Sequence, residues 1–171
     1  MNLFIYIIVY PIVWLVSRMP FRLLYIVSDF FYLIIYKLLK FRVKVVRKNL
    51  HTAFPFKSEE ELSTIEQRFY HHFCDTFLEM VKSYGMSEQE MKKRMVFKNI
   101  EVLKKYESEE RNIIIMCSHY ASYEWLLSLA YYLQHKSYAL YTPLSNPYFD
   151  RLIQKIRMKH HSYLLPRCTA H

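Results

Sequence analysis

Two residues of this sequence, His119 and Glu124, combine the types and the spacing needed for acid–base chemistry. A short, mostly β-branched run at residues 113–116 precedes them and predicts a buried strand, whereas the leucine-rich run at residues 126–130 predicts a helix. His119 then lies at the end of the strand, where open α/β sheets bind ligands, and Glu124 lies in the first helical turn, so the two side chains can converge. A carboxylate beside an imidazole fixes its tautomer and stabilises the imidazolium, which predicts a general base.

The same two residues also have a purely structural interpretation. A polar loop that leads into a helix commonly carries a surface histidine, and an acid in the first turn of a helix is favoured by the helix dipole. In this interpretation His119 is solvent-exposed and Glu124 only stabilises the start of the helix. The spacing alone leaves both interpretations open.

Capping residues mark the helices expected before this site. Ser58 followed by Glu61 forms a capping box, and one amphipathic helix is expected to run from there to about Gly85, a suitable C-cap residue. The same capping signal at Ser87 predicts a second, short helix. The apolar positions that recur at helical spacing in the long helix are Leu62, Ile65, Phe69, Phe73, Phe77, Met80 and Val81.

Strands and helices are expected to alternate around and after the site. Asn146 as N-cap and Pro147 at the first helical position start a helix in this region. Other helices are expected at residues 99–106 and from the turn that contains Glu124 to about Gln134. Strands are expected at residues 95–97, 113–116, 137–141 and 162–165. This order predicts right-handed parallel βαβ units and therefore an α/β fold.

The N-terminus carries two apolar stretches. Residues 2–17 are almost wholly apolar and approach the length of about 20 residues that a membrane span needs, so they predict a transmembrane helix or a shallow insertion. A cleavable signal peptide is the weaker alternative, because no basic segment precedes the run. Residues 23–39 are rich in aromatic side chains but contain Asp29, which favours an interfacial or hairpin helix. A buried helix of a water-soluble core is the alternative for this second stretch.

A basic cluster follows these stretches. It consists of Lys37, Lys40, Arg42, Lys44, Arg47 and Lys48. Beside a membrane segment, such a cluster favours the cytoplasmic face and anionic headgroups, although a solvated helix face would look the same. The formal net charge is +9. No nucleic-acid-binding motif accompanies it, so nucleic acid is not expected as a partner.

Composition excludes two further classes of site. Cys74, Cys117 and Cys168 are far apart and show neither disulfide nor metal-ligand spacing, so no metal site is expected. Gly85 is the only glycine, which excludes a glycine-rich phosphate loop.

The sequence around His119-x4-Glu124-Trp125 resembles the His-x4-Asp/Glu motif of glycerolipid-type acyltransferases. Within that superfamily it is most similar to the lipid A biosynthesis (lauroyl/myristoyl) acyltransferases. The other segments that carry the resemblance are Asn49-Leu50, Phe54-Pro55, the helix from Phe69 to Glu79, Tyr141-x-Pro143, Asn146-Pro147, Asp150 and Arg157.

This resemblance implies an architecture. Residues 1–40 would form membrane-associated helices, and residues 41–171 would form the N-terminal part of a glycerol-3-phosphate-acyltransferase-like αβ domain. Members of the family run longer than 171 residues. The domain is therefore expected to be truncated, and the chain alone is expected to show little activity.

The resemblance also implies a reaction. A fatty acyl chain would pass from the thioester of an acyl carrier protein to a hydroxyl of a lipid A precursor or a related glycolipid or lipid, in the assembly of lipopolysaccharide. His119 would be the general base and Glu124 would position it. Arg157 would contact anionic groups of the substrate, and Asn146, on the same substrate-binding segment, would shape the start of its helix. No metal or cofactor takes part in this chemistry.

The expected partners are the acyl carrier protein, the lipid acceptor and the membrane, with the protein at the cytoplasmic face of the bacterial inner membrane. Two alternatives remain open. The chain could be a catalytically inactive, membrane-bound remnant of the family, or a small basic membrane adaptor without enzymatic ancestry.

Overall fold

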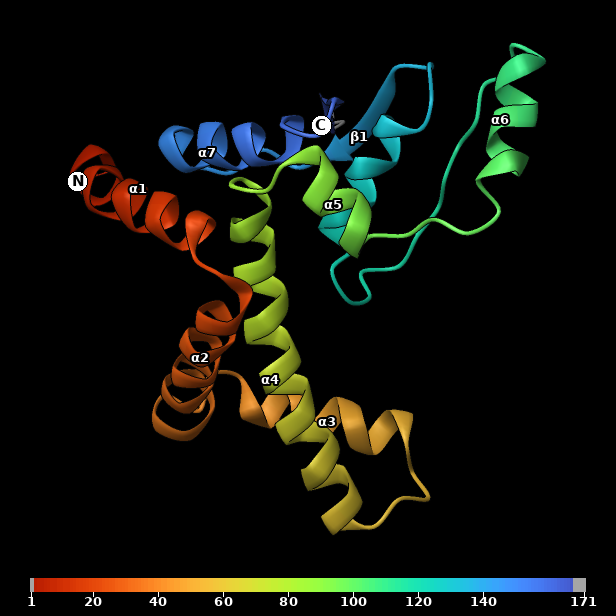
Figure 1. Cartoon of the computed structure of the whole chain (residues 1–171). Coiled ribbons are helices and arrows are strands. Elements are labelled where there is room, and N and C mark those ends of the chain that lie inside the picture. Colours follow the sequence, from red (N-terminus) through yellow and green to blue (C-terminus); the bar gives the residue numbers. More distant parts are fainter. Residues whose placement is uncertain (1, 168–171) are drawn as a thin grey trace. The chain divides into compact units, whose positions relative to one another are not determined.

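Helices account for most of the structure, a computed structural model that describes residues 2–167 (Figure 1). Contacts within the chain divide it into two compact units. One unit comprises Met1–Arg18 and Met80–His171, and the other comprises Met19–Glu79. The long helix α4, Glu59–Ser83, contributes residues to both. The boundary expected at residue 40, between anchor and acyltransferase domain, stays a prediction.

The unit of residues 19–79 is wholly helical. Helix α2 (Phe21–Tyr32) continues into a π-helical segment, η1 (Leu33–Leu38), and a turn then leads to α3 (Val43–Ala53). The core of this unit is built on three buried residues and four partly buried ones that pack against them: Tyr32, Tyr70 and Cys74, with Ile35, Tyr36, Val43 and Val46.

Helix α4 begins with the expected capping box. The Ser58 amide donates to Glu61 Oε2 at 2.9 Å, and the Glu61 amide donates to Ser58 Oγ at 3.2 Å. The residues that the helix buries are Leu62, Glu66, Tyr70, Cys74, Leu78, Val81, Lys82 and Ser83. Phe69, Phe73 and Phe77 are instead exposed, so the predicted apolar face is only partly correct. The helix has apolar residues on two sides, and α2, η1 and α3 pack against only one of them, the side of Tyr70 and Cys74.

A buried carboxylate lies on the covered side of α4. Glu66 is almost fully buried and accepts hydrogen bonds from Arg47 Nε and Nη2, both at 3.0 Å, and from the Tyr36 hydroxyl at 3.0 Å. Burial and the neighbouring Glu66 raise the pKa of Tyr36 to about 12. This charged group inside the unit is therefore paired and hydrogen-bonded, as a buried charge must be.

The other unit contains α1 (Asn2–Arg18), α5 (Glu88–Arg94), α6 (Ile100–Ser108), the 3₁₀-helix η2 (Tyr123–Tyr131) and α7 (Pro147–Met158). Strands β1 (Ser137–Tyr141) and β2 (Ser162–Pro166) pair in parallel, with Ser137 opposite Ser162 and Tyr141 opposite Pro166. Helix α7 connects them. The predicted β–α–β order of this segment is therefore confirmed.

The end of α1 packs closely against the chain after α4. A Cβ atom added to Gly85 would lie 1.9 Å from the Ser17 carbonyl oxygen, so only glycine fits there. Lys82 Nζ donates to the same oxygen at 3.0 Å. The carbonyl is one of those left unpaired at a helix C-terminus, and the ammonium satisfies it. Burial lowers the pKa of Lys82.

The expectation of an α/β fold is wrong. The described residues form a mostly helical structure with one two-stranded sheet. Residues 95–97 and 113–116 are not strands, and Ile114 and Met116 are 89% and 92% exposed. A β-branched run forms a strand only where a neighbouring strand or packed surface stabilises it, and within residues 2–167 these two segments pair with no strand.

The transmembrane helix expected at the N-terminus is not supported. Within the described part of the chain, no helix is both long and apolar enough to cross a membrane. Helix α1 has 17 residues and would span about 26 Å, whereas the hydrocarbon core of a bilayer is about 30 Å thick.

Candidate active site

The Glu124 carboxylate is held by an arginine from the far end of α7. Arg157 Nε donates to Glu124 Oε2 at 2.8 Å, and Arg157 Nη2 donates to Oε1 at 2.5 Å. The Glu124 side chain is 8% exposed and the Arg157 side chain is 23% exposed. The hydrogen bonds to Glu124 raise the pKa of Arg157 above its ordinary value, against the opposing effect of burial. This bidentate, charge-assisted contact fixes the first turn of η2 to the last turn of α7.

Tyr123 connects this ion pair to His119. Burial, and then the nearby charge of Glu124, raise the pKa of the Tyr123 hydroxyl. The His119 ring lies 4.4 Å from the Tyr123 ring, centroid to centroid, at an interplanar angle of 53°. His119 is therefore positioned by an aromatic contact with the residue that precedes Glu124.

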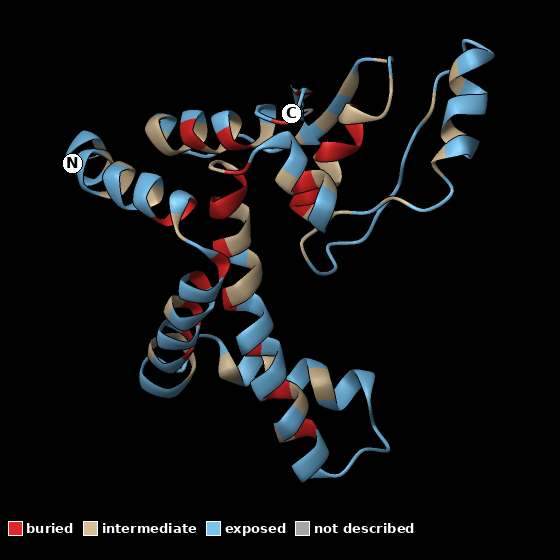
Figure 2. Ribbon diagram, in the orientation of Figure 1, coloured by how far each residue is buried: buried red, intermediate tan, exposed pale blue. Residues whose placement is uncertain are grey.

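His119 itself is exposed on an irregular segment between α6 and η2. Figure 2 shows this segment and α6 as mainly exposed, in contrast to the buried turns of η2. Ala121, two residues further on, has a left-handed backbone with φ of 49°, a conformation that residues other than glycine rarely adopt. Within residues 2–167, no hydrogen bond or ion pair joins His119 to Glu124. The expected direct contact between the two is thus absent, and their catalytic roles stay predictions.

Asn146 caps α7, as expected. Its Oδ1 accepts a hydrogen bond from the Tyr148 amide at 3.0 Å. In the same turn, Asp150 Oδ1 accepts from the Leu144 amide at 2.9 Å, and Asp150 Oδ2 accepts from Gln154 Nε2 at 2.6 Å. The two side chains thus fix the loop before α7 and the direction of the helix that carries Arg157. A contact of Asn146 with substrate stays a prediction.

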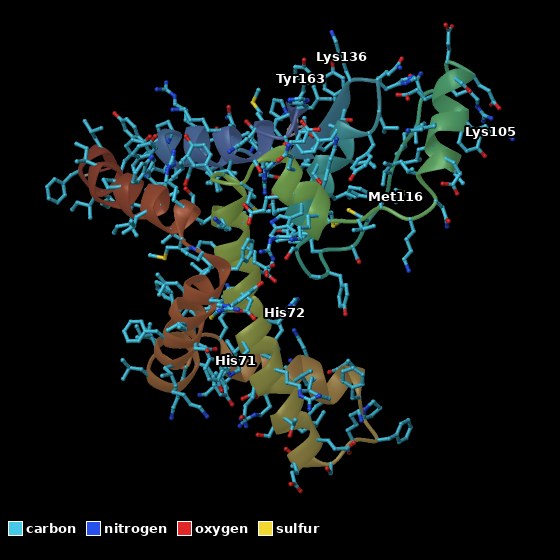
Figure 3. The ribbon with its side chains drawn as sticks, viewed as in Figure 1. His71, His72, Lys105, Met116, Lys136 and Tyr163 are labelled. Carbon is cyan, nitrogen blue, oxygen red and sulfur yellow. The ribbon has the colours of Figure 1, made fainter. Side chains whose placement is uncertain are left out.

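The sequence did not indicate a cavity of about 380 Å³ beside the two strands. Lys136 and Tyr163, both labelled in Figure 3, line it together with Gln134, His135, His161 and Ser162. Glu107 orders one wall, since its Oε1 accepts from the amides of Gln134 and His135, both at 2.7 Å. These hydrogen bonds lower the pKa of Glu107. His119, Glu124 and Arg157 do not line the cavity, so it is separate from the candidate site.

The described residues contain no group of three or more His, Cys, Asp or Glu side chains that could hold a metal ion. Of the free cysteines among the described residues, Cys74 is buried and Cys117 is exposed. Cys168 lies outside the described residues. Figure 3 shows His71 and His72 on α4. Both are remote from His119 in the sequence. His71 contacts Asp29 at 3.4 Å and stacks on Tyr32, which is a structural role.

The arrangement offers an exposed imidazole on the segment before η2, a buried carboxylate in η2 and an arginine in α7, all within one unit. A family model for bacterial lipid A biosynthesis acyltransferases matches residues 1–170. No curated protein and no solved structure gives a significant match.

Proposed function

Because the chain belongs to the bacterial lipid A biosynthesis acyltransferase family, we propose that it transfers a fatty acyl chain from acyl carrier protein to a hydroxyl of a lipid A precursor or related glycolipid. Acyl transfer, as a class of reaction, follows from family membership. The donor and the acceptor are our proposal. The observation that carries it is the extent of the match, which includes His119, Glu124 and Arg157 together.

In this proposal His119 is the general base. The hydroxyl oxygen of the acceptor attacks the thioester carbonyl carbon while His119 accepts the hydroxyl proton. The new carbon–oxygen bond forms, the carbon–sulfur bond breaks, and the proton passes to the departing thiolate of the carrier. The exposure of His119 is compatible with this role, because its imidazole can reach a substrate without displacing protein groups.

Glu124 acts as a positioning residue in this account. Its carboxylate is committed to Arg157, so it supports His119 through the start of η2 and through the Tyr123 ring. We expect loss of the carboxylate to lower turnover while donor binding is largely kept.

Arg157 is the residue proposed to bind an anionic group of the substrate. A guanidinium has five N–H donors, and two of those of Arg157 bind Glu124. The side chain is 23% exposed, so its remaining donors are available to a phosphate, which suits their planar geometry.

A lipid acceptor places the reaction at a membrane surface, and we propose the cytoplasmic face of the bacterial inner membrane. Large apolar side chains exposed on α1 support this location, among them Phe4, Ile7 and Leu15. A peripheral attachment through such residues needs no spanning helix.

A donor and acceptor screen tests the proposal. The purified chain is incubated with a lipid A precursor or a lysophospholipid as acceptor, each with either acyl-acyl carrier protein or the acyl-coenzyme A of the same chain length as donor. Products are detected by mass spectrometry. We expect slow product formation with the carrier-protein donor and less with the coenzyme A donor. Product from neither donor would favour the alternative, a catalytically inactive member of the family. Transfer only to a lysophospholipid would contradict the proposed acceptor.

A further inference from the structure

The last residue of η1 and the turn that leads to α3, together residues 38–42, present three large apolar side chains to solvent. Leu38 is 75% exposed, Leu39 is 65% exposed and Phe41 is 52% exposed. We propose that this turn, here called the 38–42 turn, inserts its apolar side chains into the interface of an anionic lipid bilayer. It lies in the unit of residues 19–79 and contains no residue of the candidate active site, so this inference goes beyond the proposed reaction.

The backbone holds the turn in place. The Leu39 amide donates to the Ile34 carbonyl at 2.8 Å, and the Phe41 amide donates to the Ile35 carbonyl at 3.0 Å. The Tyr70 hydroxyl, from the buried side of α4, donates to the Phe41 carbonyl at 2.5 Å. The Phe41 backbone is therefore tied to the core of the unit while its ring remains outside.

Two residues of the turn adopt an uncommon backbone conformation. Lys40 and Arg42 have φ angles of 47° and 54°, in the left-handed region that residues other than glycine rarely adopt. They flank Phe41 on both sides. Such conformations persist where the surrounding contacts enforce them, and they recur at functional sites. Here they accompany the exposure of consecutive apolar residues.

Positive charge surrounds the apolar side chains. From Phe30 to Ser58 the sequence contains no Asp or Glu and seven Lys or Arg: Lys37, Lys40, Arg42, Lys44, Arg47, Lys48 and Lys57. Arg47 binds the buried Glu66, and Lys57 binds Glu61. Within the described part of the chain, the other five form no ion pair. The charge around the turn is therefore available to an anionic partner.

The combination fits a lipid surface better than an acidic protein. Basic side chains of this kind attract anionic headgroups and can extend their aliphatic stems along apolar surface. An acidic protein would satisfy the charges, but it would leave Leu38, Leu39 and Phe41 without an apolar environment unless it also supplied a groove. A bilayer interface supplies both environments in the required order, with headgroups outside and acyl chains beneath.

Insertion is tested in the full chain with vesicles of phosphatidylglycerol and phosphatidylcholine that contain brominated acyl chains. The F41W variant adds an indole at the turn, and the wild-type chain, with Trp14 and Trp125, gives the baseline for quenching. The matched control is F56W, because Phe56 is fully exposed but lies outside the turn. We expect bromine quenching above the baseline for F41W and not for F56W. Equal quenching of the two, or none for F41W, would overturn the proposal.

The charge requirement is tested by sedimentation with the same vesicles without bromine. The variant K37Q/K40Q/K44Q and the control K98Q/K104Q/K105Q both lower the net charge from +9 to +6. The three control lysines are exposed and lie outside the unit of residues 19–79. We expect the first variant to bind on the order of a hundredfold more weakly, at about 1 kcal/mol per lysine, and the control to change little. Equal losses would show a general charge effect and would contradict a specific role for the turn. Unchanged helical circular dichroism confirms that each variant is folded.

Discussion

Arg157 and Glu124, 33 positions apart in the sequence, are joined by two hydrogen bonds of 2.8 Å and 2.5 Å. This contact commits the carboxylate that the sequence assigns to His119. In the proposed mechanism, Glu124 therefore supports His119 through the start of η2 and the ring of Tyr123, and a residue of α7 holds Glu124 in place.

The ion pair is expected to be strongly coupled. Removing the Glu124 carboxylate leaves the partly buried guanidinium of Arg157 without its ionic partner. E124Q should therefore destabilise the protein by about 2–4 kcal/mol, slightly less than the loss of one partner costs in a fully buried pair. R157K should cost less, because lysine keeps the charge but loses the bidentate geometry. Urea unfolding of E124A, R157A and the double variant gives the coupling energy. A coupling below about 0.5 kcal/mol, the level of an exposed pair, would show that the contact does not hold η2 to α7.

Gly85 is expected to tolerate no side chain. The added methyl of G85A would lie 1.9 Å from the Ser17 carbonyl oxygen, and Ser17 is fully buried. Overpacking of this kind typically costs about 1–3 kcal/mol. Thermal unfolding of G85A measures the loss, and Q67A, at an exposed position of α4, is the control. A melting temperature equal to that of Q67A would mean that α1 does not approach Gly85 so closely.

His160 is expected to make stability depend on pH. It is buried, its Nδ1 lies 2.7 Å from the Tyr131 hydroxyl, and burial lowers its pKa to about 4. The unfolded chain, with an ordinary histidine pKa of about 6.5, binds the proton more readily between these two values. The free energy of unfolding is therefore unaffected by protonation of His160 above about pH 6.5. It decreases as the pH falls towards 4, by up to about 3 kcal/mol.

Urea unfolding at pH 7 and pH 5 tests this dependence. H160Q should flatten the difference between the two pH values, whereas H51Q, at an exposed histidine, should leave it as in the wild type. If H160Q keeps the full dependence, another group is responsible.

The sequence predicted best those features that depend on neighbours along the chain. The caps at Ser58, Ser87 and Asn146 each bond an amide two or three residues away, so their residue types alone specify the helix starts. The prediction of a strand at residues 113–116 was wrong, because a strand forms only beside a partner strand, and local composition does not reveal whether that partner exists. The Arg157–Glu124 pair was equally beyond prediction, because nothing in either segment indicates that α7 ends beside η2.

The long helix illustrates the limit in another way. Phe69, Phe73 and Phe77 look more suited to a core than Glu66, yet Glu66 is buried and the three aromatic rings are exposed. The buried side is decided by Arg47 and Tyr36, which satisfy the carboxylate. The spacing of apolar residues predicted a helix correctly. Which side of the helix is buried depends on side chains of other helices.

His119 is the proposed base for acyl transfer. The most direct test is the rate of transfer from acyl-acyl carrier protein to a lipid A precursor by the wild type, H119A and H51A, each measured against a protein-free blank. We expect the transfer rate of H119A to be lower than that of the wild type by about 10²–10⁴-fold, or to equal that of the blank, while H51A retains the wild-type rate. A wild-type rate in H119A would contradict this role.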